Sequence, residues 1–203
     1  MKIIPKENIE STTLSKNGNG VIDHVIISHS QKLIDVQRPF VRGKFLFVRK
    51  SKFWIRGITY GTFRPDDSGI QFPDRQVVRE DFALMVDNNI NTVRVYTPPP
   101  VWLLDIALDF EPRVMVGLPW EQHITFLDDG KVVERIKNDI RKLVHDYANH
   151  PAILCYAIGN EIPSSIVRWY GANRIESFLN ELYDTVKEED PDGLVTYVNY
   201  PPT

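Results

Sequence analysis

The stretch that decides the fold is ILCYAIGNE, residues 153–161. Residues 153–158 form an unbroken run of apolar and aromatic side chains, and a Gly, an Asn and a Glu follow directly. Such a run is typical of a β-strand that is covered on both faces, as the strands of parallel sheets are. In parallel α/β folds, ligands meet the carboxyl ends of the strands. Residues 153–161 therefore predict a buried strand with binding or catalytic groups at its end.

On both sides of this stretch, segments that predict further strands alternate with segments that predict helices. We expect the other core strands at 56–61, 90–96, 114–118 and 194–198. We expect helices after Asp74, after Pro98–Pro100, and over the apolar faces at 133–147 and 175–186. Before the first strand, the apolar arms 45–48 and 53–55 flank Arg49–Lys52 and predict a β-hairpin.

Five strands separated by helices indicate an α/β protein with a parallel sheet. Both an open doubly wound sheet and a (β/α)₈ TIM barrel have such a sheet, and in the second case about five of the eight strands are present. Residues 1–35 are polar and contain Asn17–Gly20, so we expect a flexible lead-in with one short strand at 21–27. The second predicted domain covers residues 36–203.

Composition restricts the classes of function. The 203 residues are 42% hydrophobic and 25% charged, which is typical of a globular protein. A net charge of −3 gives no general attraction to nucleic acid or to anionic membranes. The single cysteine, Cys155, excludes an intrachain disulfide. The sequence has no apolar run long enough for a membrane span and no secretory signal, so we expect a cytoplasmic protein or a soluble part of a larger one.

Polar and aromatic side chains stand at the ends of all five predicted strands. In chain order they are Tyr60, Arg94, Tyr96, Trp120, Glu121, Asn160, Glu161, Asn199 and Tyr200. Aromatic faces can stack on sugar rings, and amide, carboxylate and guanidinium groups can bond hydroxyls, so the set predicts a carbohydrate site. Strand ends are polar in any α/β protein, however, and that simpler interpretation stays open.

Two of these residues suit acid–base chemistry. Partial burial favours the protonated form of a carboxyl group, which suits Glu161 as a general acid. Alternatively, Glu161 caps the next helix or pairs with an arginine. Arg94 can keep a neighbouring carboxylate ionised, or form a structural ion pair. No spacing typical of a metal site or a phosphate-binding loop is present, so we expect neither a metal nor a cofactor.

The string AIGNEIP, residues 157–163, resembles the fourth-strand end of the clan of retaining (β/α)₈ glycoside hydrolases that includes families 2 and 17. In that clan the Glu is the acid/base and the Asn bonds the sugar 2-hydroxyl, which implies these roles for Glu161 and Asn160. NTVRVY (91–96) is similar to the clan's second strand, whose Arg lies beside the nucleophile. FWIRGITY (53–60) resembles the approach to the barrel in family 2.

The resemblance covers residues 38–203 and extends to barrel domains beside family 2 glycosyltransferase domains in bacterial polysaccharide proteins. It implies retaining hydrolysis of β-linked oligo- or polysaccharides, or transglycosylation. The clan's nucleophile is a second Glu after the seventh strand, and nothing in residues 1–203 matches its motif. We therefore expect little turnover from this chain alone, and self-association through the open barrel edge. A non-catalytic carbohydrate-binding or assembly half-barrel remains the alternative. An unrelated lyase or aldolase is disfavoured, because no lysine ends a strand.

Overall fold

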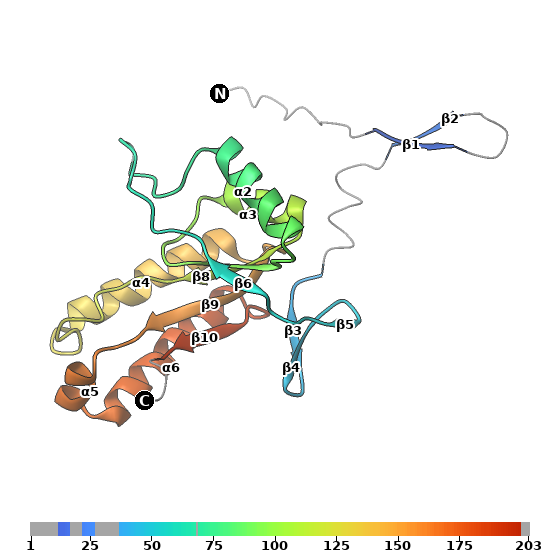
Figure 1. Cartoon of the computed structure of the whole chain (residues 1–203). Helices are drawn as coiled ribbons and strands as arrows, with labels where there is room; N and C mark the ends of the chain where they lie inside the picture. Colours follow the sequence, from blue (N-terminus) through green and yellow to red (C-terminus); the bar gives the residue numbers. More distant parts are fainter. Residues whose placement is uncertain (1–11, 17–21, 27–36, 68, 200–203) are drawn as a thin grey trace, which may run out of the picture. The chain divides into compact units, whose positions relative to one another are not determined.

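The computed structural model describes residues 12–16, 22–26, 37–67 and 69–199. The chain divides into two compact units, Met1–Gln37 and Arg38–Thr203. In the first, β1 (Thr12–Lys16) pairs antiparallel with β2 (Ile22–Ile26) (Figure 1). The strand expected at 21–27 corresponds to β2, whereas β1 was not predicted. Most of the predicted lead-in lies outside the described residues, so its flexibility stays a prediction.

The second unit begins with a three-stranded antiparallel sheet of β3 (Phe40–Arg42), β4 (Phe45–Val48) and β5 (Ser51–Lys52). The predicted hairpin is present, but its turn is only Arg49–Lys50, because Ser51 already pairs with Val48. The preceding strand β3 was not predicted, and its Phe40 ring stacks on Phe47 with centroids 5.8 Å apart.

The core is a five-stranded parallel sheet in which the strands follow one another in space as they do in sequence. These strands are β6 (Gly57–Thr59), β7 (Thr92–Val95), β8 (Arg113–Gly117), β9 (Ile153–Asn160) and β10 (Val195–Val198). A doubly wound sheet reverses its strand order at a switch point, whereas a barrel adds each strand on the same side. The observed order decides between the two predicted architectures: the fold is a partial TIM barrel.

The connecting helices are α2 (Arg75–Asp87), α3 (Val101–Phe110), α4 (Gly130–Tyr147), α5 (Ser164–Tyr170) and α6 (Ala172–Glu189). The predicted cap of α2 is confirmed, since the Asp74 carboxylate accepts from the backbone N–H groups of Gln76 and Val77. α4 and α6 lie side by side (Figure 1). The seven residues of α5 were not predicted because so short a helix carries little periodic signal.

The two faces of the parallel sheet differ in burial. Val93, Val95, Val114 and Val116 are 0% exposed. Residues of the opposite face alternate with these valines along the strands. On that face Arg94 lies opposite Met115 and Met115 lies opposite Cys155, and all three residues are half-buried. Burial raises the pKa of the Cys155 thiol to about 12, so this thiol stays protonated and unreactive at neutral pH. Arg94 therefore stands on the inner face of the barrel, between Thr59 of β6 and Met115 of β8.

Candidate functional site

The carboxyl edge of the sheet brings together Arg94 from β7 and Asn160 from the end of β9. The Arg94 Nη2 atom donates to Asn160 Oδ1 at 2.5 Å. The Arg94 guanidinium also lies over the Tyr96 ring, 4.5 Å from its centroid. Three predicted site residues from two segments of the chain thus meet at one point, where a guanidinium is held by an amide oxygen and an aromatic face.

Glu161 follows β9 directly, and its backbone is in the left-handed region with a φ of 54°. That conformation costs an L-residue about 1–2 kcal/mol, and such residues cluster at functional sites. The Glu161 N–H donates to Val198 O at 2.8 Å, which ties the residue to β10. The side chain is half-buried, and within the described part of the chain no hydrogen bond or ion pair engages its carboxylate.

The contacts around Glu161 bear on its two structural alternatives, capping of the next helix and pairing with an arginine. The residue before α5 is Pro163, and no side chain caps this helix. Arg94 bonds Asn160, the neighbour of Glu161. Among the described residues, neither helix capping nor an arginine pair engages the Glu161 carboxylate, which leaves it available for another partner.

Side chains of the loop after β8 hold the end of β9. The Trp120 Nε1 atom donates to Ile158 O at 2.8 Å. The Gln122 amide makes two bonds to the Asn160 backbone: its oxygen accepts from Asn160 N–H at 2.9 Å, and its nitrogen donates to Asn160 O. From the β10 side, the Tyr197 hydroxyl accepts from Ile162 N–H at 2.9 Å. Gln122 and Tyr197 were not among the predicted site residues.

Three predicted substrate-binding residues instead find partners inside the protein. Tyr60 is 6% exposed, and its hydroxyl donates to Asp81 Oδ2 on α2 at 2.6 Å. Burial raises the pKa of Tyr60, and the hydrogen bond and charge of Asp81 raise it further. Because its hydroxyl is turned toward α2 and is already bonded, we withdraw Tyr60 from the substrate-binding set.

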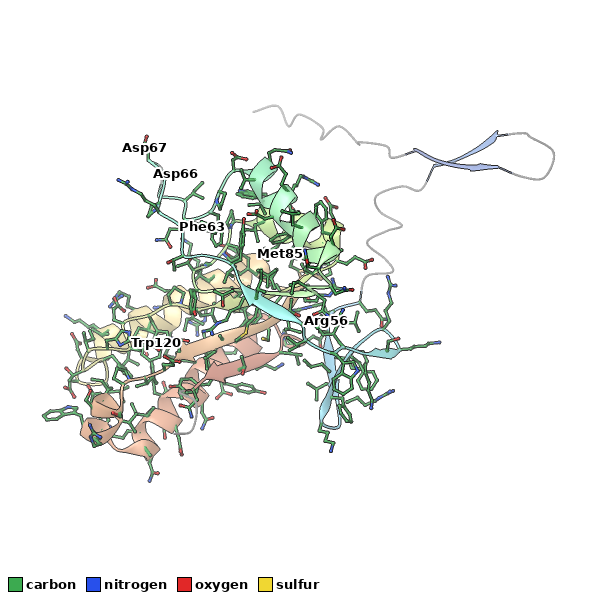
Figure 2. The ribbon with its side chains drawn as sticks, in the orientation of Figure 1. Arg56, Phe63, Asp66, Asp67, Met85 and Trp120 are labelled. Carbon is green, nitrogen blue, oxygen red and sulfur yellow. The ribbon has the colours of Figure 1, made fainter. Side chains whose placement is uncertain are left out.

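Trp120 and Glu121 are also engaged within the protein. The Trp120 ring packs edge-on against Phe126 and Phe178, with centroids 4.8 and 5.4 Å away; Figure 2 labels this tryptophan. The Glu121 carboxylate pairs with Arg135 of α4 at 2.9 Å, and this hydrogen bond lowers the pKa of Glu121. Both side chains thus have partners within the protein, and their contact with a substrate stays a prediction.

Of the remaining predicted residues, Asn199 is exposed directly after β10, and Tyr200 lies outside the described residues. A further hollow of about 520 Å³ lies beside the loop that follows β6 and contained no predicted site residue. It is lined by Phe63, Arg64, Asp66, Ile70, Phe72, Pro73, Asp74 and Trp102.

The described residues contain neither a candidate metal site nor a candidate membrane span. They contain no group of three or more His, Cys, Asp or Glu side chains that could hold a metal ion. No helix in the described part of the chain has the length and apolar character needed to cross a membrane.

Comparison with known proteins relates part of the sheet to a family. Residues 112–202, which include β8, β9 and the Asn160-Glu161 pair, match the family described as glycosyl hydrolases family 2, TIM barrel domain. Over these residues the chain is similar to part of a family 2 glycosyl hydrolase barrel. The predicted resemblance to this clan is confirmed.

Individual proteins are also similar to this chain. A β-galactosidase of Pectobacterium atrosepticum is 29% identical over 149 residues, which is 70% of this chain but 13% of the relative. A β-glucuronidase structure from Faecalibacterium prausnitzii has a TM-score of 0.66 at 18% identity, over 96% of this chain and 31% of that one. An endo-1,4-β-mannanase structure from Rhizomucor miehei has a TM-score of 0.66 at 11% identity, over 80% of this chain and 61% of that one. At these identities the structural matches show the fold, and the chain spans only a small part of the β-galactosidase.

Proposed function

We propose that residues 36–203 are the N-terminal part of a retaining β-glycosidase barrel in which Glu161 is the general acid/base. The observation that carries the proposal is the position of Glu161 at the carboxyl edge of the parallel sheet, directly after the Asn160 that Arg94 bonds, with no partner for its carboxylate among the described residues. The match of residues 112–202 to the family 2 barrel supports it. We propose that residues 1–35 are a lead-in to this domain. The β-galactosidase relative supports a β-linked oligo- or polysaccharide substrate.

The proposed reaction has two steps. Glu161 donates its proton to the glycosidic oxygen while a carboxylate nucleophile attacks the anomeric carbon and forms a covalent glycosyl-enzyme. Glu161 then takes a proton from the incoming water, which releases the sugar with its configuration retained. The two carboxyl groups of such an enzyme stand about 5–5.5 Å apart. Capture of the same intermediate by a sugar hydroxyl gives transglycosylation.

The other residues of the proposed site bind or polarise. Asn160 bonds the sugar 2-hydroxyl, and Arg94 holds the nucleophile in its ionised form through its positive charge. Tyr96, 39% exposed, and Asn199 contact the substrate at the rim, and Tyr200 stays a substrate-binding residue predicted from the sequence. No residue in 1–203 matches the nucleophile's motif, so the proposed reaction requires a nucleophile from outside these residues.

For residues 1–203 alone we propose little turnover and self-association. Among the described strands, β6 and β10 are the edges of the sheet, and Ile58 in β6 is 40% exposed. Open edges and exposed apolar groups favour pairing with another chain. A stable monomer by light scattering over a range of concentrations contradicts this part of the proposal.

The test is turnover of aryl β-glycosides by the complete polypeptide whose gene encodes residues 1–203. Glu161→Gln keeps the shape of the side chain and removes its proton transfer, so we expect a loss of about 10²–10⁴-fold. Glu176→Gln, an exposed position of α6, is the matched control. Equal rates for wild type and Glu161→Gln remove Glu161 from the acid/base role. Glycan binding without turnover supports the non-catalytic module instead.

A further inference from the structure

The end of β9 extends past its neighbour β8. The last residue pair between the two strands is Gly117 with Ala157, followed by a bond from Leu118 N–H to Ala157 O at 3.0 Å. The next residue, Pro119, has no N–H to continue the ladder. Backbone groups of residues 158–160 on that side need other partners, because an unsatisfied buried polar group costs about 1–3 kcal/mol.

Side chains of the loop supply these partners. Trp120 provides one donor for Ile158 O. Gln122 provides an acceptor for Asn160 N–H and a donor for Asn160 O, the two kinds of bond that the backbone of a continuing strand would otherwise make. A side-chain amide carries both an acceptor oxygen and a donor NH₂ group, so one Gln can make both bonds. The loop therefore extends β8 with side chains in place of backbone.

The residue between these contacts is Glu161. Asn160 before it is held from the β8 side by Gln122, and Ile162 after it is held from the β10 side by Tyr197. The Glu161 N–H itself is bonded to Val198 O. Strained backbone persists only where its surroundings over-determine it, and these contacts on both sides fix the left-handed conformation of Glu161.

We infer that Gln122 is a positioning residue for the acid/base function, acting through the Asn160 backbone on the direction of the Glu161 carboxyl group. This inference rests on the proposed function. Gln122 is placed to set the geometry of proton transfer, since a misplacement of about 1 Å can cost about 10²-fold in rate. The same two bonds fix the Asn160 side chain toward Arg94.

The test compares leaving groups in the complete polypeptide. Departure of 2,4-dinitrophenolate needs almost no protonation, whereas departure of phenolate depends on the general acid. Gln122→Met keeps the length of the side chain and removes both bonds. We expect its kcat/KM to fall at least about tenfold for phenyl β-glycosides and little for dinitrophenyl β-glycosides. Gln76→Met, at an exposed glutamine of α2, is the matched control with no change on either substrate.

Two further variants keep the outcomes distinct. Gln122→Glu retains the bond from Asn160 N–H and loses the donation to Asn160 O, so it shows the same selectivity to a smaller extent and serves if Gln122→Met does not fold. Glu161→Gln, measured alongside, shows the full leaving-group dependence. If Glu161→Gln lacks that dependence, the proposed function fails. If Glu161→Gln shows it but both Gln122 variants lose activity equally on the two substrates, or lose none, only the role of Gln122 is overturned.

Discussion

Two carboxylates beside β9 differ in their burial and in their hydrogen-bond partners. Asp190, which precedes β10, is 0% exposed and accepts from Arg38 Nη1 at 2.7 Å and from the Tyr156 hydroxyl at 2.9 Å. Glu161, which follows β9, is half-buried in a strained conformation, and no partner among the described residues engages its carboxylate.

This contrast reflects the different roles of the two ends of a barrel. Asp190 lies toward the amino ends of the strands, where it bonds Arg38, a residue 152 positions away in the chain. Glu161 lies at the carboxyl ends, where barrel enzymes place their chemistry. A carboxylate surrounded by donors stabilises the fold but has little capacity left for a ligand. A carboxylate that has no donor among the described residues can exchange a proton with a ligand.

The largest expected effect on stability is at Asp190. Asp190→Ala leaves the Arg38 guanidinium and the Tyr156 hydroxyl without their acceptor, so we expect a loss of about 3–5 kcal/mol in the free energy of unfolding. Denaturant titration of the 203-residue chain measures it. Asp184→Ala, at an exposed position of α6, should stay within about 0.5 kcal/mol. Similar values for the two variants would remove the contrast between buried and exposed carboxylates.

A smaller effect is expected from Tyr156→Phe, which removes one hydroxyl and leaves Asp190 with Arg38. A hydrogen bond to a charged group contributes about 1.5–3 kcal/mol, and the variant should lose stability in that range. The exposed Tyr183→Phe is the matched control. Unfolding of both phenylalanine variants at the same denaturant concentration would contradict a stabilising role of the Tyr156 hydroxyl.

The next largest effect is expected from acid, which should reduce the stability that the Asp190 contacts contribute to the fold. Burial alone would raise the pKa of Asp190, but the hydrogen bond and charge of Arg38 and the Tyr156 hydroxyl outweigh it and lower the pKa. A depressed pKa stabilises the fold above the unfolded value of about 3.9 and ceases to do so as the pH falls through the folded value. The difference in stability between wild type and Asp190→Ala should stay constant from neutral pH to about pH 5 and shrink below about pH 4, by at most about 1.4 kcal/mol per pH unit. A constant difference down to pH 2 contradicts this.

The smallest expected effect has the opposite sign. Glu161→Gly relieves the cost of a positive φ and should stabilise the chain by about 1 kcal/mol. Glu176→Gly, in the interior of α6, should destabilise it by about 1 kcal/mol instead. Thermal unfolding of both variants checks the pair. A loss of stability in both would show that Glu161 is not strained in the folded chain.

The fold was predictable where local patterns suffice. The apolar run at 153–158 predicted β9, and Asp74 as a helix cap predicted α2. The choice between a barrel and a doubly wound sheet required the strand order, which no local pattern carries. The helix α5 was missed because it is short.

The candidate site was predictable only in part for a similar reason. The strand-end rule found Arg94, Asn160 and Glu161, and the first two are in contact. It could not say which way Tyr60 or Trp120 points, since both partners, Asp81 and Phe178, come from helices. Gln122 acts on a backbone 38 residues away, and no spacing in the sequence signals such a contact.

The most direct test of the role of Glu161 is rescue by azide in the complete polypeptide carrying Glu161→Ala. Azide is a small nucleophile that needs no general base to attack a glycosyl-enzyme. With a dinitrophenyl β-glycoside, we expect slow turnover that rises with azide concentration and yields the β-glycosyl azide. Turnover that azide leaves unchanged, or a Glu161→Ala protein as active as the wild type, would contradict the assignment.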